Sequence, residues 1–281
     1  MDLTYDEYEA RFAPYLGNVI RQTFFDDVGM FRYGRSWTGR FNQKFKEING
    51  FDPGPWYPAL WYNIGPETEA IRYAFFNTRA ELLAEGFPRM VAEWARKNGI
   101  MDSGHPPGNY DPTPVDMNGD IFKFYRHTSI PLADAIFHYG FGEDGFKLVS
   151  SAADYYDRPV VAAEIYCAFP RDTFDSLMLY RPLMDMLVRG VNFFIPCSMC
   201  YNCSTAELAE SSEYDPVPAI LRNYSEFTGR SCMLLQGGRK VSDIGLIYPI
   251  ETLAGWFHFD SPHKHKYGTF VPPETNYQEL G

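Results

Sequence analysis

The sequence has few cations and no long apolar run, and each shortage excludes a class of protein. Its 281 residues carry 25 Lys and Arg against 36 Asp and Glu, a formal net charge of -11. A protein with this negative charge repels the phosphate backbone of nucleic acids and anionic membranes. The sequence has one basic cluster, "HKHK" at 263–266. No stretch has the length needed to span a bilayer, and "MDLTYDEYEA" lacks the basic and apolar regions of a signal peptide. We therefore expect no nucleic-acid partner, no membrane span and no signal peptide in this chain.

Cysteine is also scarce, with five residues in the whole chain, which is too few for a disulfide framework. Three of them form "CSMCYNC" at 197–203, a spacing that could hold part of an iron–sulfur cluster or a zinc ion. A fourth ligand at suitable spacing is missing. We interpret them as reduced thiols and expect no cofactor.

Aromatic residues, by contrast, are abundant at 17% of the chain. Most of them must fill the core of a protein of this size, but some would suit a cleft that stacks against sugar rings. The candidates for such contacts are Trp37, Tyr139 and Tyr166, together with Trp56, Trp61, Tyr33 and Tyr110.

Helical and strand patterns alternate along the first 200 residues, as expected for a parallel sheet. Helices are predicted over 5–16, 38–49, 68–98 (with a break at Pro88), 121–125, 146–156, 176–189 and 219–228, and strands over 18–27, 100–105, 134–140, 160–169 and 191–196. Polar residues collect at the strand ends, and no G-x-G-x-x-G or Walker segment follows a strand. These features favour an α/β fold of the TIM (β/α)8-barrel type over a nucleotide-binding sheet, although only five of eight strands are recognisable.

The character of the chain changes after residue 210. The turn-rich "SSEYDPVP" is followed by an apolar strand pattern at 241–250 and a polar tail rich in His and Pro. We therefore predict a barrel region at 1–210 that lacks its first strands, and at 211–281 the start of a second β-rich domain or an appendage to the barrel.

A single acid, Glu164, interrupts the buried strand pattern "VVAAEIYCAF" at 160–169. An unpaired carboxylate in a buried strand is costly, and at the carboxyl end of a barrel strand it is often kept for catalysis. The alternative is a structural acid paired with a nearby Arg or Tyr. We favour a catalytic role for Glu164.

Cleavage of a glycosidic bond needs a second carboxylate, and several candidates follow other strand ends. Asp26 and Asp27 end the first strand, where a helix cap or a salt bridge is the alternative role. The loop after His105 holds Asp111, Asp116 and Asp120, any of which could serve as the acid or could simply form turns. Its oxygen-rich composition could also bind calcium or sugar hydroxyls.

Three histidines, His105, His127 and His138, also follow strand ends and could bind a hydroxyl or hold an acid in place. Other hydrolase classes find less support. A Ser-His-Asp enzyme would carry a G-x-S-x-G elbow, which is absent, and the one close pair of histidines lies in the polar tail, at His263 and His265.

Six segments together resemble the α-L-rhamnosidases of glycoside hydrolase family 106 and their barrel relatives from carbohydrate-degrading bacteria. They are "TYDEYEARFAPYLGNVIRQTFFDDVG", "FKEINGFDPGPWYPALWYNIGPET", "SGHPPGNYDPTPVDMNGD", "KLVSSAADYYDRPVVAAEIYCAF", "RGVNFFIPCSM" and "VSDIGLIYPI". The resemblance implies catalysis by Glu164, in the context A-E-I-Y, with Asp27 at a position where relatives carry glutamate. Asp111, in a loop where relatives also place a glutamate, is the second choice for the acid.

The resemblance further implies a glycoside hydrolase acting on plant or microbial oligo- or polysaccharides, leaning toward an inverting mechanism. It suggests a periplasmic or extracellular location, and it implies that relatives have earlier barrel strands. An incomplete barrel exposes sheet edges, from which we expect a homo-oligomer. The alternative function is a carbohydrate-binding protein on a degenerate barrel, without turnover.

Overall fold

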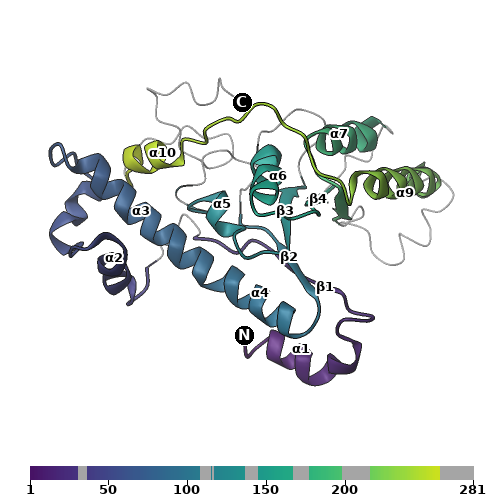
Figure 1. Ribbon diagram of the computed structural model, residues 1–281, viewed down its shortest axis with the longest axis horizontal. Helices are drawn as coiled ribbons and strands as arrows, with labels where there is room; N and C mark the ends of the chain where they lie inside the picture. The colour runs from purple at the N-terminus through teal and green to yellow at the C-terminus, as the bar shows by residue number, and fades with distance from the viewer. Residues whose placement is uncertain are drawn as a thin grey trace. The chain divides into compact units, whose positions relative to one another are not determined.

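The computed structural model describes residues 1–30, 37–107, 115, 117–136, 145–166, 177–197 and 216–259. Strands and helices alternate along the chain (Figure 1), which confirms the α/β class. The chain divides into two compact units, Met1–Ser129 with Ser242–Gly281, and Ile130–Val241. The described residues contain five strands, all paired in parallel within their unit, so a complete eight-stranded barrel is not confirmed.

The first unit has one pair of strands surrounded by helices. Its elements are α1 (Tyr5–Phe12), η1 (Ala13–Tyr15), β1 (Gln22–Phe25), α2 (Phe41–Asn49), η3 (Gly54–Leu60), α3 (Thr68–Glu85), α4 (Phe87–Lys97), β2 (Met101–Gly104), α5 (Ile121–Phe124) and α10 (Ile250–Trp256). β1 and β2 run parallel, with Gln22 opposite Met101 and Phe25 opposite Gly104. Phe25 packs against Phe87 of α4, at 5.3 Å between ring centroids, so this side of β1 faces the helices.

The predicted break in the long helical segment is confirmed. α3 ends at Glu85 and α4 begins at Phe87, with Pro88 in its first turn, where a missing N–H costs nothing. Figure 1 shows the two helices continuing in nearly the same direction. α2 ends as predicted at Gly50, which adopts a left-handed φ of +82°.

The core of the helical part is largely aromatic. α10 packs against α3, and together with α2 and η3 these helices bury one cluster of side chains: Phe41, Phe45, Leu60, Ala74, Phe75, Phe76, Val115, Leu253, Ala254 and Phe257. Ring pairs such as Phe76 and Phe257 meet edge to face at 4.9 Å. The high aromatic content is therefore mostly structural in this unit.

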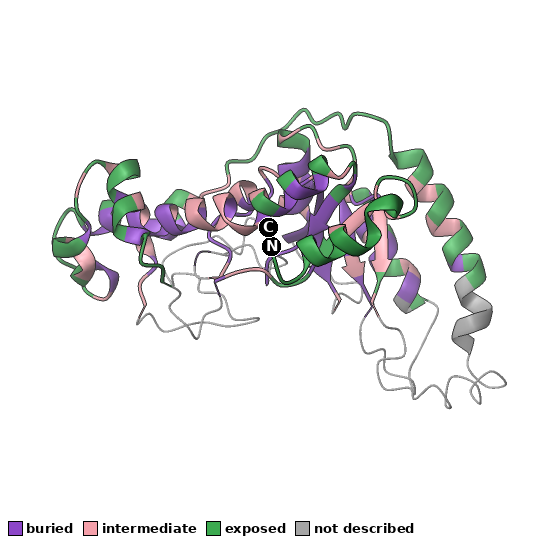
Figure 2. Cartoon of the chain, turned by 90° about the horizontal axis from the view of Figure 1, so that it is seen from below, coloured by how far each residue is buried: buried purple, intermediate pink, exposed green. Residues whose placement is uncertain are grey.

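The second unit is built on three parallel strands. Its elements are β3 (Ile130–Ala135), α6 (Gly145–Tyr155), β4 (Ala162–Ile165), α7 (Leu177–Val188), β5 (Phe193–Pro196) and α9 (Pro216–Leu235). The register places Leu132, Ala162 and Phe193 side by side, and Ile130, Leu132 and Ala162 form a buried apolar cluster. β3 is fully buried and β4 nearly so, whereas β5 is only partly buried. Figure 2 shows much of the described surface of α9 as exposed.

One predicted strand is misplaced and another is wrong. The strand expected at 134–140 corresponds to β3, which begins at Ile130 and ends at Ala135, and residues 137–140 lie outside the described residues. Residues 241–249 form no strand, and side chains there such as Ile244 and Ile247 are 82% and 93% exposed. An apolar run of strand character forms a strand only where a neighbouring strand pairs with it. None of the described helices has both the length and the apolar character needed to cross a membrane.

Candidate active site at the strand ends

The parallel pairing of β1 and β2 brings together polar residues that are 78 or more positions apart in the sequence. Asp26 and Asp27 follow the last residue of β1, and His105 follows the last residue of β2. Because Phe25 lies opposite Gly104, the residues after each strand emerge at the same edge of the sheet. This edge is the carboxyl end of the strands, where α/β enzymes place their active sites.

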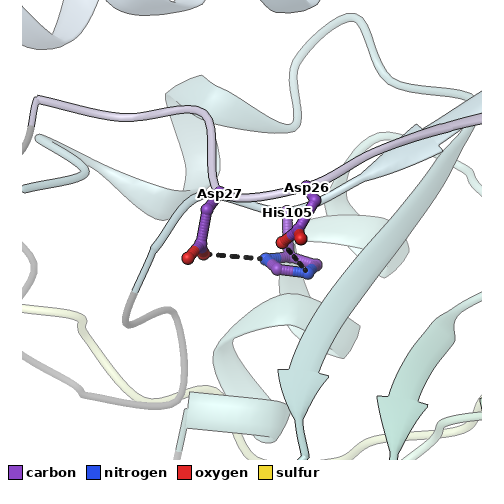
Figure 3. A group of neighbouring side chains, drawn as sticks. All are labelled: Asp26, Asp27 and His105. Atoms are coloured by element: carbon purple, nitrogen blue, oxygen red, sulfur yellow. Dashed lines mark ion pairs between the residues drawn. The ribbon is translucent and has the colours of Figure 1, made fainter. Parts of the chain in front are cut away.

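His105 lies between the two aspartates (Figure 3). Its Nε2 atom is 3.4 Å from Oδ1 of Asp26, and its Nδ1 atom is 3.5 Å from Oδ1 of Asp27. The imidazole is 1% exposed, whereas the side chains of Asp26 and Asp27 are 69% and 48% exposed. A buried ring thus positions two carboxylates that remain open to a ligand.

The backbone around this group is closely packed. The His105 amide donates to the carbonyl of Phe25 at 3.3 Å, and the Val28 amide donates to the carbonyl of His105 at 3.2 Å. Asp27 has a left-handed φ of +45°, which costs energy in any residue except glycine and is found disproportionately at functional sites. The direction of the Asp27 carboxylate is therefore imposed by the fold.

Chemically, this group offers two acids and a base within reach of one another. One ligand atom from each of Asp26, Asp27 and His105 lies within 4.8 Å of the other two, so the three residues could also hold a divalent cation. Calcium prefers a shell made entirely of oxygen, which two carboxylates and an imidazole supply only in part. The group fits hydrogen bonding to sugar hydroxyls, proton transfer, or both.

A second group of acids lies in the other unit, on β3 and β4. Asp134 and Glu164 are register partners, so their side chains leave the same face of the sheet at adjacent positions about 5 Å apart. They form the next layer after the apolar cluster of Ile130, Leu132 and Ala162, toward the carboxyl ends of the strands. Asp134 is 7% exposed, and its Oδ1 accepts a hydrogen bond from the Ile136 amide at 3.2 Å.

Asp134 was absent from the residues singled out in the sequence. The expected strand began at this aspartate, which placed it at the wrong end of the element. The run "SIPLADA" holds the missed signal, because Ile130, Leu132 and Asp134 alternate along one face. With β3 ending at Ala135, Asp134 takes the same position on its strand as Glu164 does on β4.

Two of the aromatic candidates, Trp37 and Tyr166, differ in their exposure to solvent. Trp37 is 55% exposed and rests on the ring of Phe41 at 4.6 Å, an arrangement that suits stacking against a sugar. Tyr166 is fully buried, and its hydroxyl donates to the Leu179 carbonyl at 2.6 Å and pairs with the Tyr224 hydroxyl at 2.6 Å. Burial raises the pKa of Tyr166 well above its usual range. A ring with no exposed surface does not suit the stacking role predicted for Tyr166.

Two other candidates make contacts that stabilise the fold. His127 pairs with Glu85 of α3, with its Nε2 at 2.8 Å from the carboxylate, which holds the pKa of Glu85 below its usual value. Asp120 caps α5 by accepting hydrogen bonds from the Phe122 and Lys123 amides, and burial raises its pKa. Four further candidates, Asp111, Asp116, His138 and Tyr139, lie outside the described residues.

Comparisons with known proteins show the family and a similar fold. A family model described as α-L-rhamnosidase matches residues 1–254. The fold is similar to the solved structure of a rhamnosidase from Novosphingobium sp. PP1Y, with a TM-score of 0.58 and 23% identity, over 84% of this chain and 24% of that one. The chain thus spans about a quarter of the length of that rhamnosidase. Curated proteins gave no match.

Proposed function

Because the chain belongs to the α-L-rhamnosidases of glycoside hydrolase family 106, we propose that it hydrolyses α-L-rhamnosides, from plant or microbial oligo- or polysaccharides. The observation that carries the proposal is the placement of carboxylates at the ends of parallel strands. Asp26 and Asp27 follow β1, and Asp134 and Glu164 are the penultimate residues of β3 and β4. Glycoside hydrolysis requires two carboxylates, and barrel enzymes place their catalytic residues at the carboxyl ends of the strands.

Two carboxylates divide the chemistry between them. One donates a proton to the oxygen that leaves with the rest of the substrate, and the other activates a water molecule against the anomeric carbon or attacks that carbon itself. We assign Glu164 to one of these roles and Asp27 to the other, with Asp111 as the alternative partner. The resemblance to inverting relatives favours activation of water.

The neighbours of each acid have supporting roles. His105 holds Asp27 on one side and Asp26 on the other, so that Asp26 can accept a hydrogen bond from a sugar hydroxyl. Asp134 lies beside Glu164 on the same face of the sheet and supplies a second acceptor there. Trp37 offers an exposed ring to a sugar of the substrate.

The test is hydrolysis of 4-nitrophenyl α-L-rhamnoside by the wild type and by Glu164→Gln, Asp27→Asn and Asp111→Asn. Removal of a catalytic acid should lower kcat/KM by roughly 100- to 10,000-fold. Glu47→Gln is the matched control, since Glu47 is an exposed glutamate of α2 that contacts Lys44. Loss of activity in Asp111→Asn but not in Asp27→Asn would move the second role to Asp111.

The competing function is carbohydrate binding without turnover. It predicts that L-rhamnose or a rhamnoside binds in calorimetry to the wild type and to Glu164→Gln alike, while neither protein releases nitrophenol. That result would contradict the hydrolase proposal.

A further inference from the structure

The backbone that follows Glu164 has a strained conformation. Tyr166, two residues after this acid, has a φ of +68°, in the left-handed region that a residue with a bulky side chain rarely adopts. Such a conformation persists only where the surrounding structure holds it, and it is common at active sites. The contacts that hold Tyr166 therefore bear on the direction of the Glu164 side chain.

Two hydrogen bonds hold the side chain of Tyr166. Its hydroxyl is 2.6 Å from the Leu179 carbonyl of α7 and 2.6 Å from the Tyr224 hydroxyl of α9. A carbonyl oxygen can only accept, so the single proton of the Tyr166 hydroxyl is donated to Leu179. The Tyr224 hydroxyl must then donate its proton to the oxygen of Tyr166. Each hydroxyl thus has one defined role, and α9 supplies one of the two bonds.

Tyr224 is the point at which α9 enters the core of the second unit. Among residues 222–235 of this helix it alone is buried, with 4% of its surface exposed. Its ring meets the ring of Tyr166 edge to face at 5.7 Å and the ring of Tyr180 at 5.5 Å. Packing against these two rings therefore orients the Tyr224 hydroxyl toward Tyr166.

The strained residue is coupled to Glu164 through the main chain. The Ile165 carbonyl accepts a hydrogen bond from the Cys197 amide, directly after β5, at 2.7 Å. Because the peptide between residues 165 and 166 is a rigid plane, a change of φ at Tyr166 would rotate this carbonyl away from Cys197. Glu164 lies one residue earlier, opposite Ile195 of β5. Its carboxylate would therefore move with the end of β4.

We propose that Tyr224 is a positioning residue for Glu164. Its hydroxyl holds Tyr166 in the left-handed conformation, and Tyr166 fixes the end of β4 so that the Glu164 carboxylate keeps its direction. Tyr224 acts only through Tyr166 and does not touch the reacting atoms. The inference deepens the proposed function and rests on it, because it concerns the acid that we assign to cleavage of the glycosidic bond. A helix that carries none of the proposed acids thereby sets the rate of the reaction.

The experiment measures kcat and KM for 4-nitrophenyl α-L-rhamnoside with the wild type, Tyr224→Phe and Tyr180→Phe. Tyr224→Phe removes a hydroxyl and keeps the ring, and circular dichroism checks that the protein is folded. Because a displacement of about 1 Å at the reacting centre can cost about 100-fold, we expect kcat to fall about tenfold or more. KM should change by less than about twofold, since Tyr224 does not contact the substrate. Tyr180→Phe is the matched control, because its ring packs against Tyr224 but its hydroxyl makes no hydrogen bond to the described residues.

Tyr166→Phe breaks the same contact from the other side. If the two hydroxyls act as one link, adding Tyr224→Phe to Tyr166→Phe should change kcat by less than about twofold. A purely structural role of Tyr224 would lower the Tm and leave the kcat of the folded protein unchanged. An unchanged kcat in Tyr224→Phe, an equal loss in Tyr180→Phe, or losses that multiply in the double variant would overturn the proposal.

A wild type without turnover would refute the proposed hydrolysis, but not the link between Tyr224 and Glu164. Crystal structures of the wild type and of the double variant Tyr166→Phe/Tyr224→Phe test that link directly. We expect φ at position 166 to become negative in the variant and the Glu164 side chain to change direction. The same φ and the same direction of Glu164 in both proteins would overturn the proposal.

Discussion

Gly104→Ala should disrupt the site of Asp26, Asp27 and His105 more than any other glycine substitution in the first unit. Gly104 ends β2 with a φ of +148°, a conformation that residues with a side chain rarely adopt. A methyl group there would lie 2.3 Å from the carbonyl oxygen of Phe25 and 2.4 Å from its ring. That carbonyl accepts the hydrogen bond from the His105 amide, so it cannot move without displacing the imidazole.

The loss of folding stability expected for Gly104→Ala is estimated by comparison with Gly50→Ala. Gly50 also has a positive φ, +82°, but a methyl group there meets no atom within 4 Å. Its substitution should cost only the left-handed strain, about 1 kcal/mol. Gly104→Ala adds a backbone clash of about 1–3 kcal/mol and weakens a hydrogen bond worth about 1 kcal/mol. We expect Gly104→Ala to be about 3 kcal/mol more destabilising than Gly50→Ala.

The assay is urea denaturation monitored by tryptophan fluorescence. All five tryptophans, at positions 37, 56, 61, 94 and 256, belong to the first unit, so the signal reports the unfolding of that unit. The midpoint should shift strongly for Gly104→Ala and weakly for Gly50→Ala. If the two variants lose the same stability within about 0.5 kcal/mol, the packing assigned to Gly104 is incorrect.

Three other substitutions test separate contacts. Asn192→Ala should cost about 2–3 kcal/mol in urea denaturation followed by circular dichroism, because it leaves the buried Val161 amide without an acceptor. Tyr166→Phe should cost about 1 kcal/mol in the same assay, and a stability equal to that of the wild type would contradict the role of its hydroxyl. Burial opposes the charge on Glu81, but hydrogen bonds from Arg126 and Lys123 outweigh it and lower the pKa of Glu81 below 4.5. Its contribution to stability is present above that pH and is lost as the pH falls through the lower folded pKa, so Glu81→Gln should flatten the acid limb of a plot of Tm against pH.

Local signals in the sequence were sufficient for most helices. Gly50 ends α2 because a left-handed residue there requires glycine, and Pro88 marks the start of α4 because a missing amide is tolerated in the first turn. Such signals depend on a few neighbouring residues, which is why they can be read without knowing the tertiary structure.

Strand positions depend on pairing, and the sequence located them less well. β3 contains Pro131 and three small residues of low strand propensity, yet it is fully buried and pairs with β4. The opposite error occurred at residues 241–249, where a favourable apolar pattern forms no strand. In both cases the partner in space determined the outcome.

For the candidate site, too, the sequence identified residues but not how they are arranged in space. Asp26, Asp27 and His105 could be identified as polar residues at strand ends, but their closeness follows from the register that places Phe25 opposite Gly104. The sequence could not show that Tyr166 has a φ of +68° and points its hydroxyl at Tyr224 inside the fold. The sequence pattern predicts which residues lie at the edge of a sheet, whereas the backbone conformation of the folded protein determines where their side chains point.

A crystal structure of Glu164→Gln with a bound rhamnoside would test the central claim most directly. The account predicts a sugar ring within hydrogen-bonding distance of the substituted side chain at position 164, at the carboxyl end of β4. A sugar that makes no contact with position 164, or that binds away from the strand ends, would contradict it.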